Sequence, residues 1–112
     1  MPEEQSPTQM TLELEAVCNN KNFSTIPNSN SEFCIYTYKA EYESYAQIAR
    51  KGFFNPAATF LNPGDTVRVF RFDIQGNLEH FLNYIVMSVD KINRKVVVAC
   101  TLNTNLKNKI IE

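Results

Sequence analysis

Hydrophobic and polar residues alternate along three segments in the second half of the chain. The segments cover residues 66–73, 81–89 and 94–102, and short polar stretches around Gly76 and Asn93 separate them. Alternation with a period of two is typical of a strand that buries one face. The three segments therefore predict a β-meander.

The last of these segments is apolar on both of its alternating sets of positions. Val96, Val98 and Cys100 form one set, and Val97 and Ala99 belong to the other. Such a pattern is typical of a strand that lies centrally in a sheet or is covered on both sides.

The pattern changes its period between residues 33 and 53. Positions 33–39 are rich in aromatic and β-branched residues, which favour a strand. From Tyr45 to Phe53 the apolar residues recur at three- and four-residue intervals, which predicts a helix over residues 41–51. Gly52 is placed to end this helix in a left-handed conformation.

A second short helix is predicted to begin at Pro56. Asparagine is a favoured capping residue and proline a favoured first helical residue, so Asn55 is expected to cap this helix. The pair Pro63-Gly64 then forms a turn that stops the helix and leads into the first strand of the meander.

The N-terminal third differs from the rest of the chain. Residues 1–11 are polar, residues 11–17 alternate apolar and acidic side chains, and residues 19–30 are rich in asparagine. The first stretch is typical of disorder, the second of an edge strand that adds to another chain, and the third of a long loop. We expect a flexible or extended arm over residues 1–32 and a compact domain over residues 33–112.

Length and composition limit the fold. A chain of 112 residues with 44% hydrophobic and 21% charged residues is expected to form one globular domain. Four or five short strands with little helix predict a mainly β fold with a short helical insertion (α+β). We expect a small, partly closed β-barrel or sandwich with an extended N-terminal arm, because closure removes exposed strand edges.

Charge and hydropathy exclude several classes. The net charge is −1, divided into −4 over residues 1–33 and +3 over residues 34–112. This excess is too small for a dedicated nucleic-acid binder. No apolar run approaches the roughly 18 residues that cross a bilayer, and the acidic N-terminus does not resemble a secretory signal. Neither a membrane nor nucleic acid is an expected partner.

No arrangement of catalytic residues is visible. The only histidine, His80, lacks a recognisable nucleophile, and the carboxylates fall at turns, where they bond to their own backbone. Cys18, Cys34 and Cys100 have no metal-binding spacing and are expected to be reduced, with Cys34 and Cys100 in the core. We therefore expect no enzymatic activity, metal or cofactor.

Arginine and aromatic residues mark the expected contact surface, because both are enriched in protein interfaces. One strand interleaves arginines with phenylalanines, tyrosines cluster between Tyr36 and Tyr45, and the alternating arm segment supplies apolar side chains. The candidate interface residues are Leu12, Leu14, Val17, Tyr42, Tyr45, Arg68, Phe70 and Arg71.

Three segments carry a resemblance to a known family. They are Ile35-Tyr36-Thr37-Tyr38-Lys39, the run from Ile48 through Gly52-Phe53-Phe54-Asn55-Pro56-Ala57, and Leu61-Asn62-Pro63-Gly64-Asp65-Thr66-Val67-Arg68-Val69. Their order and spacing over residues 34–101 resemble small virion structural proteins of tailed bacteriophages and prophages, which are head-associated or capsid decoration proteins. Pro56 departs from the small polar or acidic residue expected after the asparagine, and the N-terminal arm lies outside the resemblance.

The resemblance implies a capsid decoration (cement) or head-fibre base protein in the virion head, assembled in the host cytoplasm. Its partners would be the major capsid protein or other virion proteins, and it would bridge capsid subunits as a homo-oligomer, with a trimer as one candidate. The alternative hypothesis is a nucleic-acid-binding module with an SH3-like or OB-like barrel, since aromatic and basic residues on one strand can stack single-stranded nucleic acid.

Overall fold

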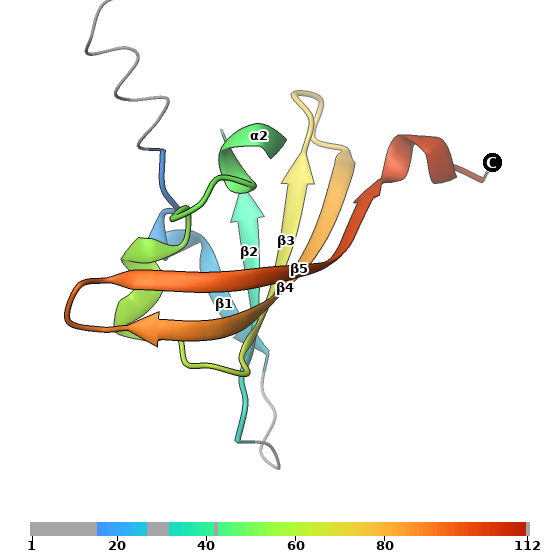
Figure 1. Cartoon of the computed structure of the whole chain (residues 1–112). Helices are drawn as coiled ribbons and strands as arrows, with labels where there is room; N and C mark the ends of the chain where they lie inside the picture. Colours follow the sequence, from blue (N-terminus) through green and yellow to red (C-terminus); the bar gives the residue numbers. More distant parts are fainter. Residues whose placement is uncertain (1–15, 27–31, 42, 112) are drawn as a thin grey trace, which may run out of the picture.

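Five strands of a mixed sheet organise the part of the chain that the computed structural model describes, residues 16–26, 32–41 and 43–111 (Figure 1). The strands are β1 (Phe23–Ile26), β2 (Ile35–Ala40), β3 (Thr66–Phe72), β4 (Leu78–Asp90) and β5 (Lys95–Asn105). They lie in sequence order, with β2 and β3 parallel and every other pair antiparallel. The prediction of a mainly β fold with a short helical insertion is confirmed, and the sheet is not closed into a barrel.

The helical insertion is the crossover that the parallel pair requires, because a hairpin cannot join parallel strands. It contains helix α2 (Tyr45–Ile48) and the 3-10 helix η2 (Asn55–Thr59). A capping box starts α2: the Ser44 hydroxyl accepts from the Gln47 amide, and the Gln47 side chain accepts from the Ser44 amide. The helix is shorter than the predicted span of 41–51, since turns replace it before Gly52, whose φ is +88°.

The predicted cap of the second helix is wrong. Phe54 occupies the N-cap position of η2 and makes no side-chain capping bond. The Asn55 side chain instead accepts a hydrogen bond of 2.9 Å from the backbone amide of Val96, at the start of β5. Asn55 therefore joins the crossover to the edge of the sheet.

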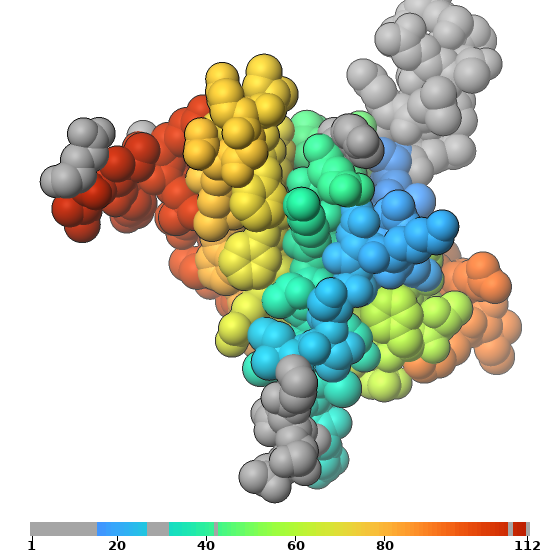
Figure 2. Space-filling view, turned by 180° about the vertical axis from the view of Figure 1, so that it is seen from behind, coloured from blue at the N-terminus to red at the C-terminus, as the bar shows by residue number. Residues whose placement is uncertain are grey.

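Part of the Asn-rich region predicted as a loop is a strand. β1 pairs with β2 from Phe23↔Tyr38 to Ile26↔Ile35. Before it, Asn19 caps the 3-10 helix η1 (Asn20–Asn22) by accepting from the Lys21 amide. Seen from behind, β1 lies beside β2 and next to the chain around residue 60 (Figure 2), where the Phe23 and Phe60 ring centroids are 5.1 Å apart.

Strand β5 occupies the edge of the sheet, so the prediction of a central or doubly covered strand is wrong for residues 94–102. It pairs with β4 on one side only, and Val97 is 53% exposed. The apolar residues that suggested full coverage leave an exposed apolar edge instead. After β5 the chain forms the 3-10 helix η3 (Leu106–Lys109), which projects from the sheet (Figure 1).

The core lies between one face of the sheet and the crossover. The sheet contributes alternate residues of β2, β3 and β4, and the crossover contributes two adjacent phenylalanines, two alanines and a leucine. The largest fully buried side chains include Tyr38, Phe53, Ile48, Leu61 and Leu82. Because these residues belong to segments far apart in the sequence, the core fixes the crossover on this face.

A buried carboxylate joins the start of β3 to its neighbours. The Asp65 side chain is buried and accepts hydrogen bonds from the amides of Cys34 (3.0 Å) and Asn62 (2.9 Å). The Asp65 carbonyl also accepts from the Val86 amide on β4. Next to it, Gly64 has a φ of +96° and lies so close to the Phe33 ring that a Cβ there would clash. The corner predicted from Pro63-Gly64 is therefore tightly packed.

Candidate binding surfaces

The sheet face opposite the crossover is the first candidate surface. Strand register places its side chains in rows across the sheet: Lys39, Phe70 and Phe81 form one row, and Thr37, Arg68, Asn83 and Leu102 form the next. None of these residues belongs to the buried core. We call this surface the open face, and in the view from behind the yellow atoms of β3 lie uncovered at the surface (Figure 2).

Aromatic and cationic groups meet on the open face. The rings of Phe70 and Phe81 are 5.1 Å apart at an angle of 44°, a favourable tilted contact. The Lys39 ammonium lies 5.5 Å from the centre of the Phe72 ring, within the range of a cation–π interaction. The surface therefore combines large apolar area with positive charge, a composition typical of interfaces.

The structure separates the predicted residues of β3. Arg68 and Phe70 lie on the open face, but Arg71 points to the other side of the strand. Its guanidinium donates to the Glu43 carbonyl (3.0 Å) and to the Glu79 carboxylate, which Lys107 also contacts at 3.0 Å. Hydrogen bonds from Lys107 and then Arg71 hold the pKa of Glu79 below its ordinary value. Arg71 thus ties the crossover to the β3–β4 hairpin.

Of the other predicted interface residues, the structure describes Tyr45 and Val17, and neither belongs to the rows of the open face. Tyr45 stacks on His80 with 5.1 Å between ring centroids, and its hydroxyl accepts a hydrogen bond from the Asn103 side chain. Val17 is partly exposed on the N-terminal segment. Leu12, Leu14 and Tyr42 lie outside the described residues.

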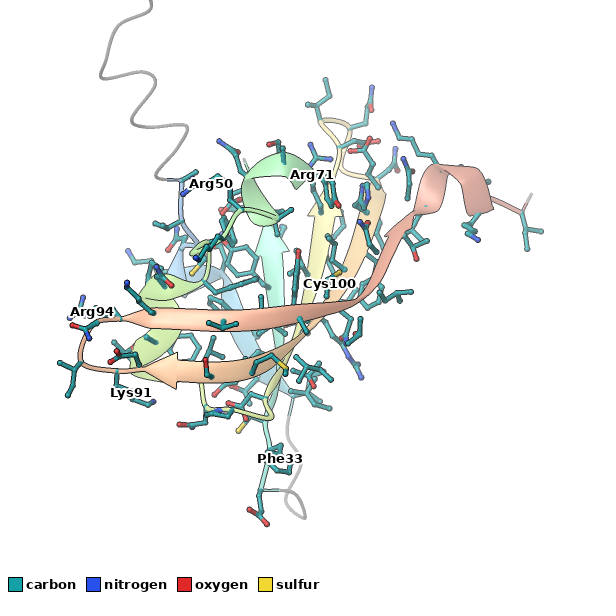
Figure 3. All side chains as sticks on the ribbon, in the orientation of Figure 1. Phe33, Arg50, Arg71, Lys91, Arg94 and Cys100 are labelled. Carbon is teal, nitrogen blue, oxygen red and sulfur yellow. The ribbon has the colours of Figure 1, made fainter. Side chains whose placement is uncertain are left out.

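A groove between β5 and the crossover is the second candidate surface. It has a volume of about 640 Å³, and Tyr45 to Asn55 form one wall while Lys95 to Cys100 form the other. Buried apolar side chains of Ile48, Phe53 and Tyr84 lie at its base. Cys100 lies midway along β5, on the side of the strand that faces the crossover with Arg50 (Figure 3). We call this surface the β5 groove.

The charged residues that line the β5 groove are all cations. Arg50 and Lys51 come from the crossover and Lys95 from β5, and the lining contains no carboxylate. The depression beside Ala16 differs, because Glu41 and Glu43 line it. The β5 groove thus combines an apolar base with a positive rim. Sequence reasoning missed it because its two walls are about 45 residues apart in the chain, and only the fold brings them together.

The described thiols and phenols are poorly suited to nucleophilic chemistry where they are buried. Burial raises the pKa of the Cys18 thiol to about 12, so it is protonated at neutral pH. Burial and a hydrogen bond to Glu43 likewise raise the pKa of Tyr38. Cys18 is the buried cysteine, whereas Cys34 is half-buried and Cys100 exposed, so the prediction that Cys34 and Cys100 are core residues is wrong.

Residues 16–26, 32–41 and 43–111 contain neither a metal-binding group nor a membrane-spanning helix. Within these ranges no three His, Cys, Asp or Glu side chains gather in a group that could hold a metal ion. No helix in the same ranges has the length and apolar character needed to cross a membrane.

The chain matches no protein-family model, no curated protein and no solved structure.

Proposed function

We propose that the protein is a non-enzymatic structural component of a phage or prophage virion head. In this role it is a capsid decoration (cement) or head-fibre base protein that binds and bridges capsid subunits as a homo-oligomer, with a trimer as one candidate. The sequence resemblance over residues 34–101 supplies the virion assignment. The physical support is an uncovered sheet face on which aromatic and cationic side chains meet.

The observation that carries the proposal is the open face. Contiguous apolar area exposed on a small domain marks an interaction site. Here the uncovered side holds the Phe70–Phe81 pair, Arg68 and Leu102, which is 46% exposed. Arginine and aromatic anchors of this kind supply most of the binding energy in protein interfaces.

Co-sedimentation with phage heads tests the proposal. Heads built from the major capsid protein of the same phage or prophage genome are incubated with the purified protein and pelleted, and the bound fraction is titrated. We expect saturable binding. The double substitution Arg68→Ala and Phe70→Ala is expected to weaken it at least about 30-fold, since the loss of even one anchor worth about 2 kcal/mol has that effect.

The matched control is Ile92→Ala. Ile92 is also a large apolar residue and is 93% exposed, but it lies in the turn between β4 and β5. Its substitution is expected to leave head binding unchanged, and circular dichroism checks that the double variant is folded. Absence of binding by the unmodified chain, or equal binding by the double variant, would contradict the proposal.

The alternative function is binding of single-stranded nucleic acid on the same face. The specific observation in its favour is that Lys39 and Arg68 lie among Phe70, Phe72 and Phe81, because bases stack on aromatic rings and phosphates pair with cations. Since the sheet is not closed, this alternative depends on the open face and not on a barrel. Binding of a labelled oligonucleotide that falls steeply with salt would favour it over the virion role.

A further inference from the structure

The free edge of β5 offers hydrogen-bonding groups to the β5 groove. The Val96 amide points away from β4, because it donates to the Asn55 side chain of the crossover. Every residue of β5 from Val96 to Cys100 pairs with a residue of β4, and the one extra residue in this stretch lies in β4. Backbone groups alternate with a period of two, so the amides of Val98 and Cys100 point the same way.

An extended segment would therefore find three complementary features in one place. The edge of β5 supplies backbone partners, Ile48, Phe53 and Tyr84 supply an apolar base, and the rim supplies positive charge. Recognition by strand addition uses this combination, with backbone bonds giving affinity and side-chain pockets giving specificity. The best occupant is a short strand that alternates apolar and acidic residues.

The chain itself contains such a segment in Thr11-Leu12-Glu13-Leu14-Glu15. In an extended conformation its leucines lie on one face and its glutamates on the other. The leucines match the apolar base of the β5 groove, and Glu13 and Glu15 match its cations. Residues 1–33 carry a net charge of −4 and residues 34–112 carry +3, so the attraction is general as well as local.

Ala16 marks where the Thr11–Glu15 segment joins the described fold. Ala16 follows the segment directly and lines the depression on the Glu41 and Glu43 side of the crossover, where the Arg50 side chain donates to its carbonyl at 3.3 Å. That depression shares no lining residue with the β5 groove. Arg50 also lines the β5 groove, so the segment starts beside the crossover wall; the homo-oligomer proposed above assigns it to the groove of a second copy, and the mixing experiment below separates this from docking on the same molecule.

We propose that the β5 groove binds the Thr11–Glu15 segment of a second copy of the chain, which adds to the edge of β5 as an extra strand. Each copy then gives one segment and receives one, a head-to-tail exchange that builds a ring or a larger lattice. Because every contact is repeated around the assembly, a modest single affinity is sufficient. This inference rests on the homo-oligomer proposed above but uses a different surface from the open face.

A charge exchange between segment and groove tests the inference on the full chain. One variant carries Glu13→Lys and Glu15→Lys, and the other carries Lys51→Glu and Lys95→Glu. We expect each variant alone to self-associate about tenfold or more weakly at low salt, because like charges then face each other. An equimolar mixture of the two is expected to recover association, measured by sedimentation velocity.

The matched control for the groove variant is Lys91→Glu with Lys109→Glu. These two lysines lie outside the lining of the β5 groove, so self-association is expected to stay within about twofold of the unmodified chain. If the segment and groove variants associate as strongly as this control, the inference is overturned. If association recovers in a single chain that carries all four exchanges but not in the mixture of the two variants, the segment docks on its own molecule. That result would overturn the second-copy assignment.

Disulfide capture locates the contact independently of charge. One chain carries Leu12→Cys or Leu14→Cys together with Cys34→Ser and Cys100→Ser, and the other retains Cys100 and carries Cys34→Ser. Mild oxidation of the mixture is expected to give a covalent heterodimer, because a disulfide requires Cα atoms within about 7 Å. Buried Cys18 stays unreactive in both chains. Absence of heterodimer from both introduced thiols would overturn the placement along β5.

The outcomes separate this inference from the proposed function. If the Arg68 and Phe70 variant loses head binding but the charge exchanges do not change self-association, the virion role is supported and the strand exchange is contradicted. If self-association depends on the exchanged charges but the chain does not bind heads, the strand exchange is supported and the virion role is contradicted.

Discussion

Replacing Asp65 by alanine is expected to lower the free energy of unfolding by about 2–4 kcal/mol. The change leaves the amides of Cys34 and Asn62 without their carboxylate acceptor at a site where the side chain is 2% exposed. An unsatisfied buried donor costs about 1–3 kcal/mol, and bonds to a charged acceptor lie at the upper end. Urea titration followed by circular dichroism measures the loss.

Asp73→Ala is the matched control for the Asp65 prediction. Asp73 also accepts from two backbone amides, those of Gln75 and Asn77, but it does so in an exposed hairpin where water replaces the lost acceptor. We expect a loss below about 1 kcal/mol there. Equal losses for the two variants would contradict the structural role given to Asp65. Asp65→Asn keeps one acceptor oxygen and is expected to fall between them.

Phe53→Ala is expected to cost about 3–5 kcal/mol, which is the largest effect of a single substitution that we anticipate. Phe53 is fully buried, and its ring packs against those of Tyr38 and Phe54 at centroid distances of 6.0 and 5.1 Å. Removing a buried phenylalanine loses transfer free energy and leaves a cavity. The same urea titration measures this loss of stability.

Phe81→Ala provides the comparison for Phe53. Phe81 has the same side chain but lies half-buried on the open face. Among the described aromatic rings, only that of Phe70 packs against it. Its loss is expected to be less than half that of Phe53. The opposite order would contradict the burial of Phe53 in the core.

The meander was predictable because its determinants are local. Alternating apolar residues set the three strands, and Gly76 and the residues around Asn93 set the turns. The helical insertion was predictable from its change of period. Its exact extent was not, because α2 ends at Ile48 and turns follow, which bring Phe53 and Phe54 into the core.

Features that depend on distant partners could not be predicted. β1 has only four residues amid asparagines, and its pairing with β2 gives it strand geometry. Asn55 is a favoured capping residue, yet its side chain accepts a hydrogen bond from the Val96 amide, about 40 residues away in the chain. The edge position of β5 likewise depends on sheet order, which no local pattern contains.

The binding surfaces were predictable only in part. Arginine and phenylalanine on β3 pointed to the open face, and strand alternation could also have separated Arg71 from Arg68 and Phe70, since 68 and 70 share a face and 71 does not. The β5 groove left no local signal. Its cations, Arg50, Lys51 and Lys95, become neighbours only when the crossover lies against β5.

Multi-angle light scattering of the full chain tests the central claim that the protein acts by assembling with other polypeptides. The mass is measured across a concentration series at low and at physiological salt. We predict a mass that is a multiple of the 12.9 kDa chain and that falls as salt is raised. A constant mass of 12.9 kDa at every concentration and salt would contradict self-assembly through these surfaces.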